Sequence, residues 1–210
     1  HIGIARTPES TRPIAMSNSV AKLLAMVVNR VLAPIAQHTI IDRQRGFVRG
    51  RSITDNILET ESLAIRFVKF YAAKSGIVLF DFAAAFPSLA HRWIFTVLRT
   101  MQFPEWLIDI IKRLYEDCSI ELLYGSVSHQ PFCALAGIKQ GCPLSGTLFA
   151  LALDLFLRMI CLTIPAHLGM VTVFADDFAI VAPHMVDVLL SLATVISVLH
   201  TGAPTKVNPN

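Results

Sequence analysis

Two short β-prone runs separated by a pair of aspartates constrain this chain more than any other feature. Val171–Phe174 and Phe178–Val181 are apolar, and Ala175, Asp176 and Asp177 lie between them. Such runs, separated by so few residues, predict an antiparallel β-hairpin. Aspartate is common in turns, so an Asp-Asp pair alone is a weak signal. Two adjacent carboxylates nevertheless repel one another and resist desolvation, and a bound cation would offset this.

A third acid, Asp81, lies near the end of the apolar run Ile77–Phe82. The unbroken apolar run predicts a buried central strand, in which an unpaired acid would be unfavourable. If this strand and the hairpin are both central in one sheet, Asp81, Asp176 and Asp177 can converge on one edge of it. Three oxygen donors suit Mg²⁺, and two such ions would stabilise both oxygens of an in-line phosphoryl displacement.

The remaining periodicity predicts a mixture of helices and antiparallel strands. A second hairpin over 120–135, turning at Gly125-Ser126, precedes a glycine-punctuated loop over Gly137–Gly146. Helices are expected at 17–31 (capped by Ser17 or Ser19, with Pro34 just past the end), about 52–71, 87–101, 105–115, 147–162 and 185–199. The tight hairpins favour an α+β fold, an antiparallel sheet with helices on one face, over a doubly wound parallel sheet.

Charge is unevenly divided along the chain. Residues 1–75 hold 11 Lys and Arg against 5 Asp and Glu, a net +6, whereas residues 76–210 hold 7 against 10, a net −3. This division suits a protein that contacts polyanions with its first part and holds cations with its second. The densest basic cluster, Arg43–Arg51, has four arginines beside Gly46 and Gly50. It suits phosphate recognition, although a solvated loop is an equally good interpretation.

Composition excludes several other classes of protein. With 54% apolar and 16% charged residues, the chain is not of the disordered type. The most apolar stretches, Thr147–Ile164 and Ala179–Leu199, are interrupted by charged residues or proline, so buried helices are favoured and no membrane partner is expected. Four cysteines without a CxxC pair, and no signal-peptide pattern, predict an intracellular protein of the nucleus or cytoplasm. The ends, His1 and Pro204–Asn210, predict a fragment.

Five ordered segments resemble one enzyme family. LFDFAAAF (79–86), GIKQGCPLSG (137–146) and VFADD (173–177) resemble the palm of reverse transcriptases, most of all the non-LTR, LINE-type retrotransposon enzymes. RPIAMSNSVAKLL (12–24) and IIDRQRGFVRGRSITDNIL (40–58) resemble that group's finger segments. A joint match is far more specific than any single motif. The resemblance implies a right-hand polymerase palm over 76–210, partial and mostly helical fingers over 1–75, and no thumb in this chain.

The resemblance also implies an activity and a set of ligands. The chain would be an RNA-directed DNA polymerase domain that uses an RNA template, a DNA primer, deoxynucleoside triphosphates and two Mg²⁺ ions, which Mn²⁺ could replace. Asp81, Asp176 and Asp177 match the family's metal-binding acids, and the backbone carbonyl of Phe82 would add a further ligand. Without a thumb, the isolated chain is expected to be inactive or nearly so.

Further roles follow from the same motif positions. Phe86 matches the aromatic residue that lies under the incoming sugar and would clash with a 2′-hydroxyl. The other implied nucleotide-binding residues are Arg49, Arg51 and Gln140, and the implied template or primer residues are Arg43, Arg45, Gly141, Phe174 and Ala175.

Two other hypotheses remain at this stage. The chain could be a non-catalytic remnant of a mobile element that keeps the fold and its affinity for nucleic acid, although the intact set of three acids weighs against decay of the site. A receiver-like signalling domain is the weakest alternative, because it needs acids at the carboxyl ends of parallel strands rather than on a hairpin.

Overall fold

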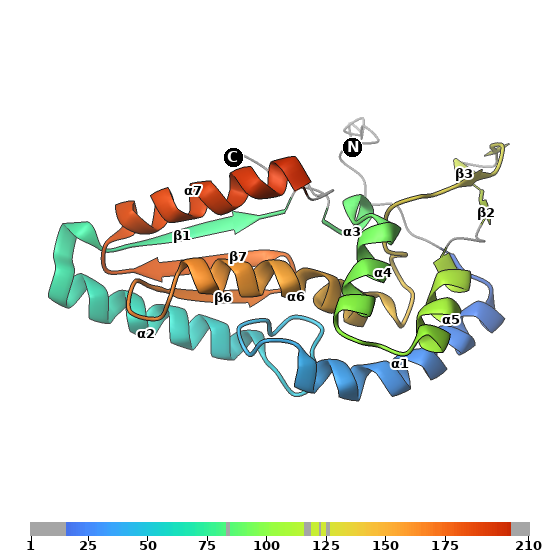
Figure 1. The fold of residues 1–210 in the computed structure, drawn as a ribbon, viewed down its shortest axis with the longest axis horizontal. Coiled ribbons are helices and arrows are strands. Elements are labelled where there is room, and N and C mark those ends of the chain that lie inside the picture. The colour runs from blue at the N-terminus through green and yellow to red at the C-terminus, as the bar shows by residue number, and fades with distance from the viewer. Residues whose placement is uncertain (1–15, 83–84, 116–118, 122, 125–126, 203–210) are drawn as a thin grey trace, which may run out of the picture.

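The computed structural model describes residues 16–82, 85–115, 119–121, 123–124 and 127–202. Its main sheet has three strands, β1 (Gly76–Asp81), β6 (Met170–Phe174) and β7 (Asp177–Ala182), in the order β1-β7-β6. Both neighbouring pairs are antiparallel. Figure 1 shows this sheet on the side of the molecule where α2 and α7 lie, with α1 and α5 on the opposite side. The predicted α+β class and the predicted β6–β7 hairpin are confirmed.

The helices follow the predicted pattern with shifted ends. They are α1 (Ser19–Thr39), α2 (Ile53–Tyr71) with the 3₁₀ helix η2 (Ala72–Lys74), α3 (Ala85–Ser88), α4 (His91–Thr100), α5 (Glu105–Tyr115), α6 (Ser145–Thr163) and α7 (Met185–Gly202). The single helix expected from Pro87 to Met101 is therefore two helices, α3 and α4. Two small antiparallel pairs, β2 (Ser119–Ile120) with β5 (Phe132–Cys133) and β3 (Leu123–Tyr124) with β4 (Val127–Ser128), agree with the second predicted hairpin.

Helix α1 is longer than its sequence pattern predicted. Asn18 caps it, because the Asn18 side chain accepts a 2.8 Å hydrogen bond from the Val20 amide, so neither Ser17 nor Ser19 is the cap. Pro34 lies inside the helix rather than beyond its end. Leu32 and Ala36, on either side of Pro34, are both buried in the core. Their packing offsets the hydrogen bond that proline removes from the helix.

Strand β1 differs from its predicted place in the sheet. It is an edge strand, and its burial alternates along the chain instead of being complete. Val78 and Phe80 are half-buried, whereas Ile77, Leu79 and Asp81 are exposed. The expectation of a buried central strand was therefore wrong. The run is apolar on both faces because the second face, with Leu79 73% exposed, lines a groove beside α2.

Helices cover both faces of the sheet. On one face, the Thr60 hydroxyl of α2 lies 3.1 Å from the Thr172 hydroxyl of β6. On the other face, Phe156 of α6 packs near Phe178 of β7, with 6.0 Å between ring centroids. The helix on the first face, α2, lies within residues 1–75, so it does not contradict the expectation that the part over 76–210 has its helices on one face of the sheet.

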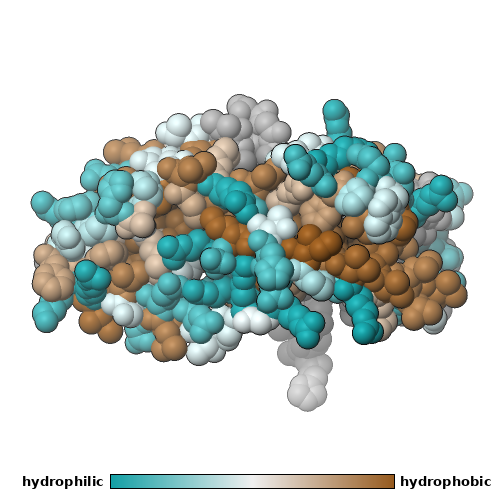
Figure 2. All heavy atoms as spheres, turned by 60° about the horizontal axis from the view of Figure 1, so that its bottom comes forward, coloured by the Kyte–Doolittle hydropathy of each residue, from teal (hydrophilic) through white to brown (hydrophobic). Residues whose placement is uncertain are grey.

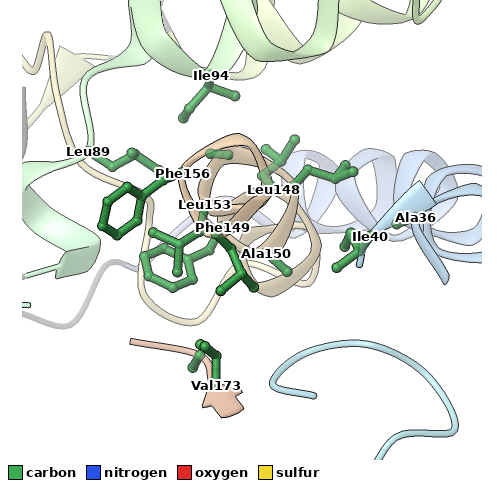
Figure 3. Packing of buried hydrophobic residues seen from close by; sticks show 14 of the residues in the cluster. Ala36, Ile40, Leu89, Ile94, Leu148, Phe149, Ala150, Leu153, Phe156 and Val173 are labelled. Carbon is green, nitrogen blue, oxygen red and sulfur yellow. The ribbon is translucent and has the colours of Figure 1, made fainter. Parts of the chain in front are cut away.

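The hydrophobic core is built around α6, most of whose residues are buried. Figure 3 shows this helix between Ile94 of α4 and Val173 of β6, with Ile40 at the end of α1 beside it. Because α6 contacts α1, α4 and α7, it joins the helical part of the molecule to the sheet. The packing of the core therefore determines the position of the loop after α1 relative to the β6–β7 hairpin.

Within the part of the chain that the structure describes, two helices are long and apolar enough to cross a membrane by length and composition alone. They are α1 and α6, and 61% of the apolar window of α6 is buried inside the fold, as in the core helices of many globular proteins. The window of α1 is 22% buried. The exposed apolar residues of α1 include Leu23, Val27 and Val31. Figure 2 shows hydrophobic side chains on the surface in the region of α1.

Asp154 is a fully buried acid of α6 that joins this helix to the end of α1. Its carboxylate accepts hydrogen bonds from the Ile41 amide at 2.8 Å and from the Arg158 guanidinium at 2.6 Å. Arg158 also donates to the carbonyl of Thr39, the last residue of α1. The carboxylate is therefore fully paired, as a buried charge must be.

Replacing Asp154 by alanine is expected to lower the free energy of unfolding by about 2–3 kcal/mol, because the Ile41 amide then lacks its acceptor. Denaturant titration measures this change. The matched control is Glu105→Ala, which breaks the Arg99–Glu105 pair, whose side chains are 50% and 63% exposed. That loss should be below about 1 kcal/mol. Equal losses for the two variants would contradict a bridging role for Asp154.

Candidate functional site

The three predicted acids lie at one end of the sheet. Asp81, the last residue of β1, is directly opposite Asp177, the first residue of β7. Ala175 and Asp176 form the turn between β6 and β7. The sequence pattern had placed Asp177 in this turn as well, but it is the first residue of β7. Asp81 and Asp177 are exposed, and Asp176 is half-buried. The register thus places Asp81 beside Asp177, with Asp176 preceding Asp177 in the turn. Convergence of all three carboxylates on one site stays a prediction.

The chemistry of this set fits a divalent cation. Directly opposed residues on neighbouring antiparallel strands point to the same face, and two like charges placed there repel one another. Carboxylate oxygens are the donors that Mg²⁺ prefers, and a cation between them would offset the repulsion. Among the residues that the structure describes, no group of three or more His, Cys, Asp and Glu side chains is already gathered in a metal-holding arrangement. The residues present are thus an opposed pair with a third acid beside it.

A largely apolar groove of about 740 Å³ runs between α2 and the face of the sheet that carries Asp81 and Asp177. Thr172, Phe174 and Leu79 line it together with the inward side of α2. The two acids are at the groove's end, because they end β1 and begin β7. They therefore lie where an apolar wall meets solvent.

The basic cluster Arg43–Arg51 lies in the loop that follows α1, called here the arginine-rich loop, and this loop packs against the β6–β7 hairpin. The Arg45 amide donates to the Val173 carbonyl at 2.9 Å, and the Val173 amide donates to the Arg43 carbonyl at 3.0 Å. These bonds add a short parallel bridge between Gln44 and Val173 at the outer edge of β6. The loop and the acid-bearing turn are consequently neighbours, although more than 120 residues separate them in the sequence.

The four arginines of this loop have different surroundings. Arg45 donates to Asn56 at 2.6 Å and to Glu59 at 2.5 Å, and Arg43 lies 3.8 Å from Glu59. Arg49 is exposed and makes no hydrogen bond or ion pair with the described residues. Of the four, Arg49 has the guanidinium that is most available to an external phosphate.

Arg51 is used inside the protein. Its side chain is 15% exposed and donates to the carbonyls of Gln37, Ile40, Ile41 and Gln44, with a further contact to Asp42. Two of these carbonyls, those of Gln37 and of the C-cap residue Ile40, belong to the end of α1, where helical carbonyls lack partners within the helix. The geometry therefore gives Arg51 a structural role, and a triphosphate contact would require these bonds to break.

Phe86 is held by two other rings. It stacks on Phe149 of α6 with ring centroids 4.4 Å apart and an angle of 8° between planes. Phe47 of the arginine-rich loop meets it edge-on at 5.6 Å. The Phe86 backbone carbonyl also accepts a 2.8 Å hydrogen bond from the Ile138 amide. Its position is thus fixed from the core, from the loop and from the segment that carries Gln140.

Gln140 and Gly141 lie in the loop that leads into α6. Gly141 has a φ of 89°, a conformation that favours glycine. Ser145 donates to the Lys139 carbonyl at 2.7 Å, and its oxygen lies 3.2 Å from the Tyr115 hydroxyl. Because the Ser145 hydroxyl hydrogen is used on Lys139, the Tyr115 hydroxyl is the donor in this pair, and burial raises the pKa of Tyr115. The loop is therefore anchored to α5 on one side and to α6 on the other.

Phe82 and Phe174 flank the acids on their strands. The Phe82 ring is buried next to Phe156 and Phe178, at centroid distances of 5.4 and 5.3 Å, and anchors the end of β1. Phe174 is half-buried at the groove. The arginine-rich loop thus contacts both Phe86, through the Phe47 ring, and the turn that carries Asp176, through Gln44.

Comparison with known proteins identifies the family. The family model described as "Reverse transcriptase (RNA-dependent DNA polymerase)" matches residues 4–210. The chain belongs to the reverse transcriptase family. The retrotransposon-type reverse transcriptase expected from the sequence motifs is thereby confirmed at the level of the family.

Several curated proteins resemble this reverse transcriptase chain. It is 32% identical, over 85% of its length, to the Retrovirus-related Pol polyprotein from type-2 retrotransposable element R2DM of Drosophila melanogaster, and it covers 17% of that protein. It is 26% identical, over 88% of its length, to the Transposon TX1 uncharacterized 149 kDa protein of Xenopus laevis, and covers 15% of it. The chain spans less than a fifth of the length of either relative.

Solved structures of telomerase share the fold. The apo telomerase of Candida tropicalis truncated from its C-terminal domain aligns with a TM-score of 0.60 at 12% identity, over 90% of this chain and 39% of that one. The telomerase of Candida albicans, in complex with a TWJ fragment of telomeric RNA, aligns with a TM-score of 0.60 at 11% identity, over 89% of this chain and 34% of that one. The right-hand polymerase fold expected from the motifs is thus confirmed.

Two buried polar residues of this reverse transcriptase chain escaped the sequence-based reasoning. Gln44 contacts the acid-bearing turn, and Asp154 contacts the end of α1. From the sequence, Asp154 is only one of the charged residues that interrupt the apolar stretch Thr147–Ile164. For Gln44, the available signal was one uncharged polar residue among arginines. For Asp154, it was one acid within a strongly apolar stretch. Neither signal identifies a partner more than 100 residues away.

Proposed function

We propose that this chain is the polymerase domain of a non-LTR retrotransposon reverse transcriptase, which extends a DNA primer on an RNA template. The observation that carries the proposal is the register of the sheet, in which Asp81 is directly opposite Asp177, next to Asp176 in the turn. The family match over residues 4–210 supports the same reaction class. The activity in that family's description, RNA-dependent DNA polymerase, supports an RNA template.

The proposed reaction is nucleotidyl transfer. The primer 3′-hydroxyl attacks the α-phosphorus of a deoxynucleoside triphosphate, a new P–O bond forms, the bond to pyrophosphate breaks, and the hydroxyl proton passes to solvent. Asp81, Asp176 and Asp177, with the backbone carbonyl of Phe82, would hold two Mg²⁺ ions. When bound, these ions would stabilise the negative charge on the attacking and leaving oxygens.

The other residues would position the substrates. Phe86 would lie under the incoming sugar and exclude a 2′-hydroxyl, and its packing against Phe149 and Phe47 supports a fixed wall there. Arg49 and Gln140 would contact the nucleotide. Arg43, Arg45, Gly141, Phe174 and Ala175 would lie along template or primer. Arg51 would act indirectly, because it holds the arginine-rich loop in shape.

We further propose that residues 1–75 form part of the fingers and residues 76–210 the palm. The end of α2 at Tyr71 and the start of β1 at Gly76 support a boundary between them. We also propose that the protein is intracellular and acts in the nucleus or the cytoplasm.

The test is primer extension by the purified protein that carries this chain. With an RNA template, a DNA primer and deoxynucleoside triphosphates, the primer should lengthen when Mg²⁺ is present and should not lengthen after chelation. Salt-sensitive RNA binding without metal-dependent synthesis would instead favour a non-catalytic remnant. A DNA template in a parallel reaction measures the preference for RNA.

A further inference from the structure

Gln44 is completely buried, and its side-chain amide is bonded to the turn that carries Asp176. Its Oε1 accepts a 2.9 Å hydrogen bond from the Ala175 amide and a 2.8 Å hydrogen bond from the Gly46 amide. Its Nε2 donates to the Ala175 carbonyl at 3.0 Å. Since backbone amides only donate and carbonyls only accept, these partners define the orientation of the side-chain amide. Gln44 thus pairs with both polar groups of Ala175.

Ala175 needs such support because its backbone is in an unfavourable conformation. It is the first residue of the two-residue turn and has a φ of 59°. Glycine is favoured at turn positions with positive φ, because a Cβ is unfavourable there. A tertiary contact must therefore hold Ala175 in place, and the described contacts to its amide and carbonyl come from Gln44.

The chain around Gln44 is fitted to the same turn. A Cβ added at Gly46 would overlap the Ala175 backbone and lie 2.7 Å from its Cα. Gly46 therefore allows the loop to approach closely enough for Gln44 to reach the turn. The backbone bonds of Arg43 and Arg45 to Val173 fix the direction of approach.

We propose that Gln44 is a positioning residue that holds Ala175 in its left-handed conformation and so sets the direction of the Asp176 carboxylate. The inference rests on the proposed function, because it assumes that Asp176 holds a metal ion. Asp176 follows Ala175 directly, so a change in the Ala175 backbone angles would change the direction of the Asp176 carboxylate relative to Asp81 and Asp177. In this way Gln44 itself would control the direction of the Asp176 carboxylate without touching substrate.

The first experiment replaces Gln44 by methionine, which keeps the volume of the side chain but removes its three hydrogen bonds. We expect kcat for primer extension to fall about 10–100-fold and the half-saturating Mg²⁺ concentration to rise, as for other residues that orient metal ligands. The Kd for RNA should stay unchanged. Hydrogen exchange of the segment around Ala175 should become faster, which reports on the turn independently of catalysis.

The second experiment adds Ala175→Gly to Gln44→Met. Glycine adopts a positive φ without penalty, so the double variant should recover a large part of the lost kcat and Mg²⁺ affinity. A general loss of stability would not be repaired in this way. The matched control, Thr60→Val, removes a side-chain hydrogen bond to Thr172 of β6, the strand that precedes the turn, and should leave the Mg²⁺ dependence of synthesis unchanged.

The outcomes separate this inference from the proposed function. If Asp176→Asn abolishes synthesis while Gln44→Met matches the parent protein in kcat and Mg²⁺ dependence, the positioning role of Gln44 is wrong. If Asp176→Asn remains active, the proposed function fails instead, and the exchange measurement still decides whether Gln44 holds the turn. If Gln44→Met does not fold, the double variant must fold and be active; failure to fold would overturn the inference.

Discussion

Replacing Asp176 by asparagine is expected to abolish Mg²⁺-dependent primer extension, with a loss of about a thousand-fold or more. Asparagine has nearly the same shape as aspartate, so the substitution removes the negative charge and leaves the size of the side chain unchanged. A metal-bound site contributes several kcal/mol of charge stabilisation to the transition state, and each 1.36 kcal/mol is about a factor of ten in rate. Single-turnover extension of a labelled primer measures the loss.

The control for this substitution is Asp187→Asn. Asp187 is an exposed acid in the first turn of α7, where a negative charge contributes only about 0.3–1 kcal/mol to the helix. We expect its variant to extend primers at the parent rate. Retained incorporation by Asp176→Asn, or an equal loss in Asp187→Asn, would contradict the assignment of the hairpin acids to the reaction.

The local part of the site was predictable from the sequence. Two apolar runs around Asp176 and Asp177 predict a hairpin, since the pattern that defines the strands and their turn lies within twelve residues. The position of Asp177 was wrong by one residue, because a two-residue turn places it in β7. The register between β1 and β7 joins residues 96 positions apart, Asp81 and Asp177, and only the structure provides it.

Burial was predicted less well than secondary structure. An apolar run such as Ile77–Phe82 predicts burial on both faces, yet one face of β1 lines the groove beside α2. Likewise, Pro34 normally marks a helix end, but the packing of its neighbours Leu32 and Ala36 carries α1 past it. Both errors arise where tertiary packing decides a feature that local pattern rules assign on average.

The arginine-rich loop shows the same limit for function. Four arginines in a short segment suit phosphate recognition or a solvated loop equally well, and the sequence pattern does not distinguish one arginine from another. The structure divides them, because Arg51 is bonded to the carbonyls at the end of α1, while Arg49 faces solvent. The residue with the most specific contact to the acid-bearing turn is Gln44, which has no charge. Its partner, Ala175, lies 131 residues further along the chain.

Phe86→Ala is expected to weaken discrimination between deoxyribonucleotides and ribonucleotides by about 10–100-fold. The Phe86 ring is stacked on Phe149 and held edge-on by Phe47, so it cannot move aside easily for a larger sugar. Forcing extra atoms against a well-packed wall typically costs about 1–3 kcal/mol, and 1.4 kcal/mol corresponds to a factor of ten. Alanine removes the wall, so the extra 2′-hydroxyl would be accommodated.

The measurement is the ratio of kcat/KM for a deoxynucleotide to that for the matching ribonucleotide, on one RNA template. Losing the stacked ring also lowers stability, but the ratio is insensitive to the active fraction because both substrates are measured with one preparation. Phe86→Tyr, which keeps the ring, is the control and should keep the parent ratio. An unchanged ratio in Phe86→Ala would show that the sugar is not selected at this ring, and selection would then have to come from another residue beside the acids.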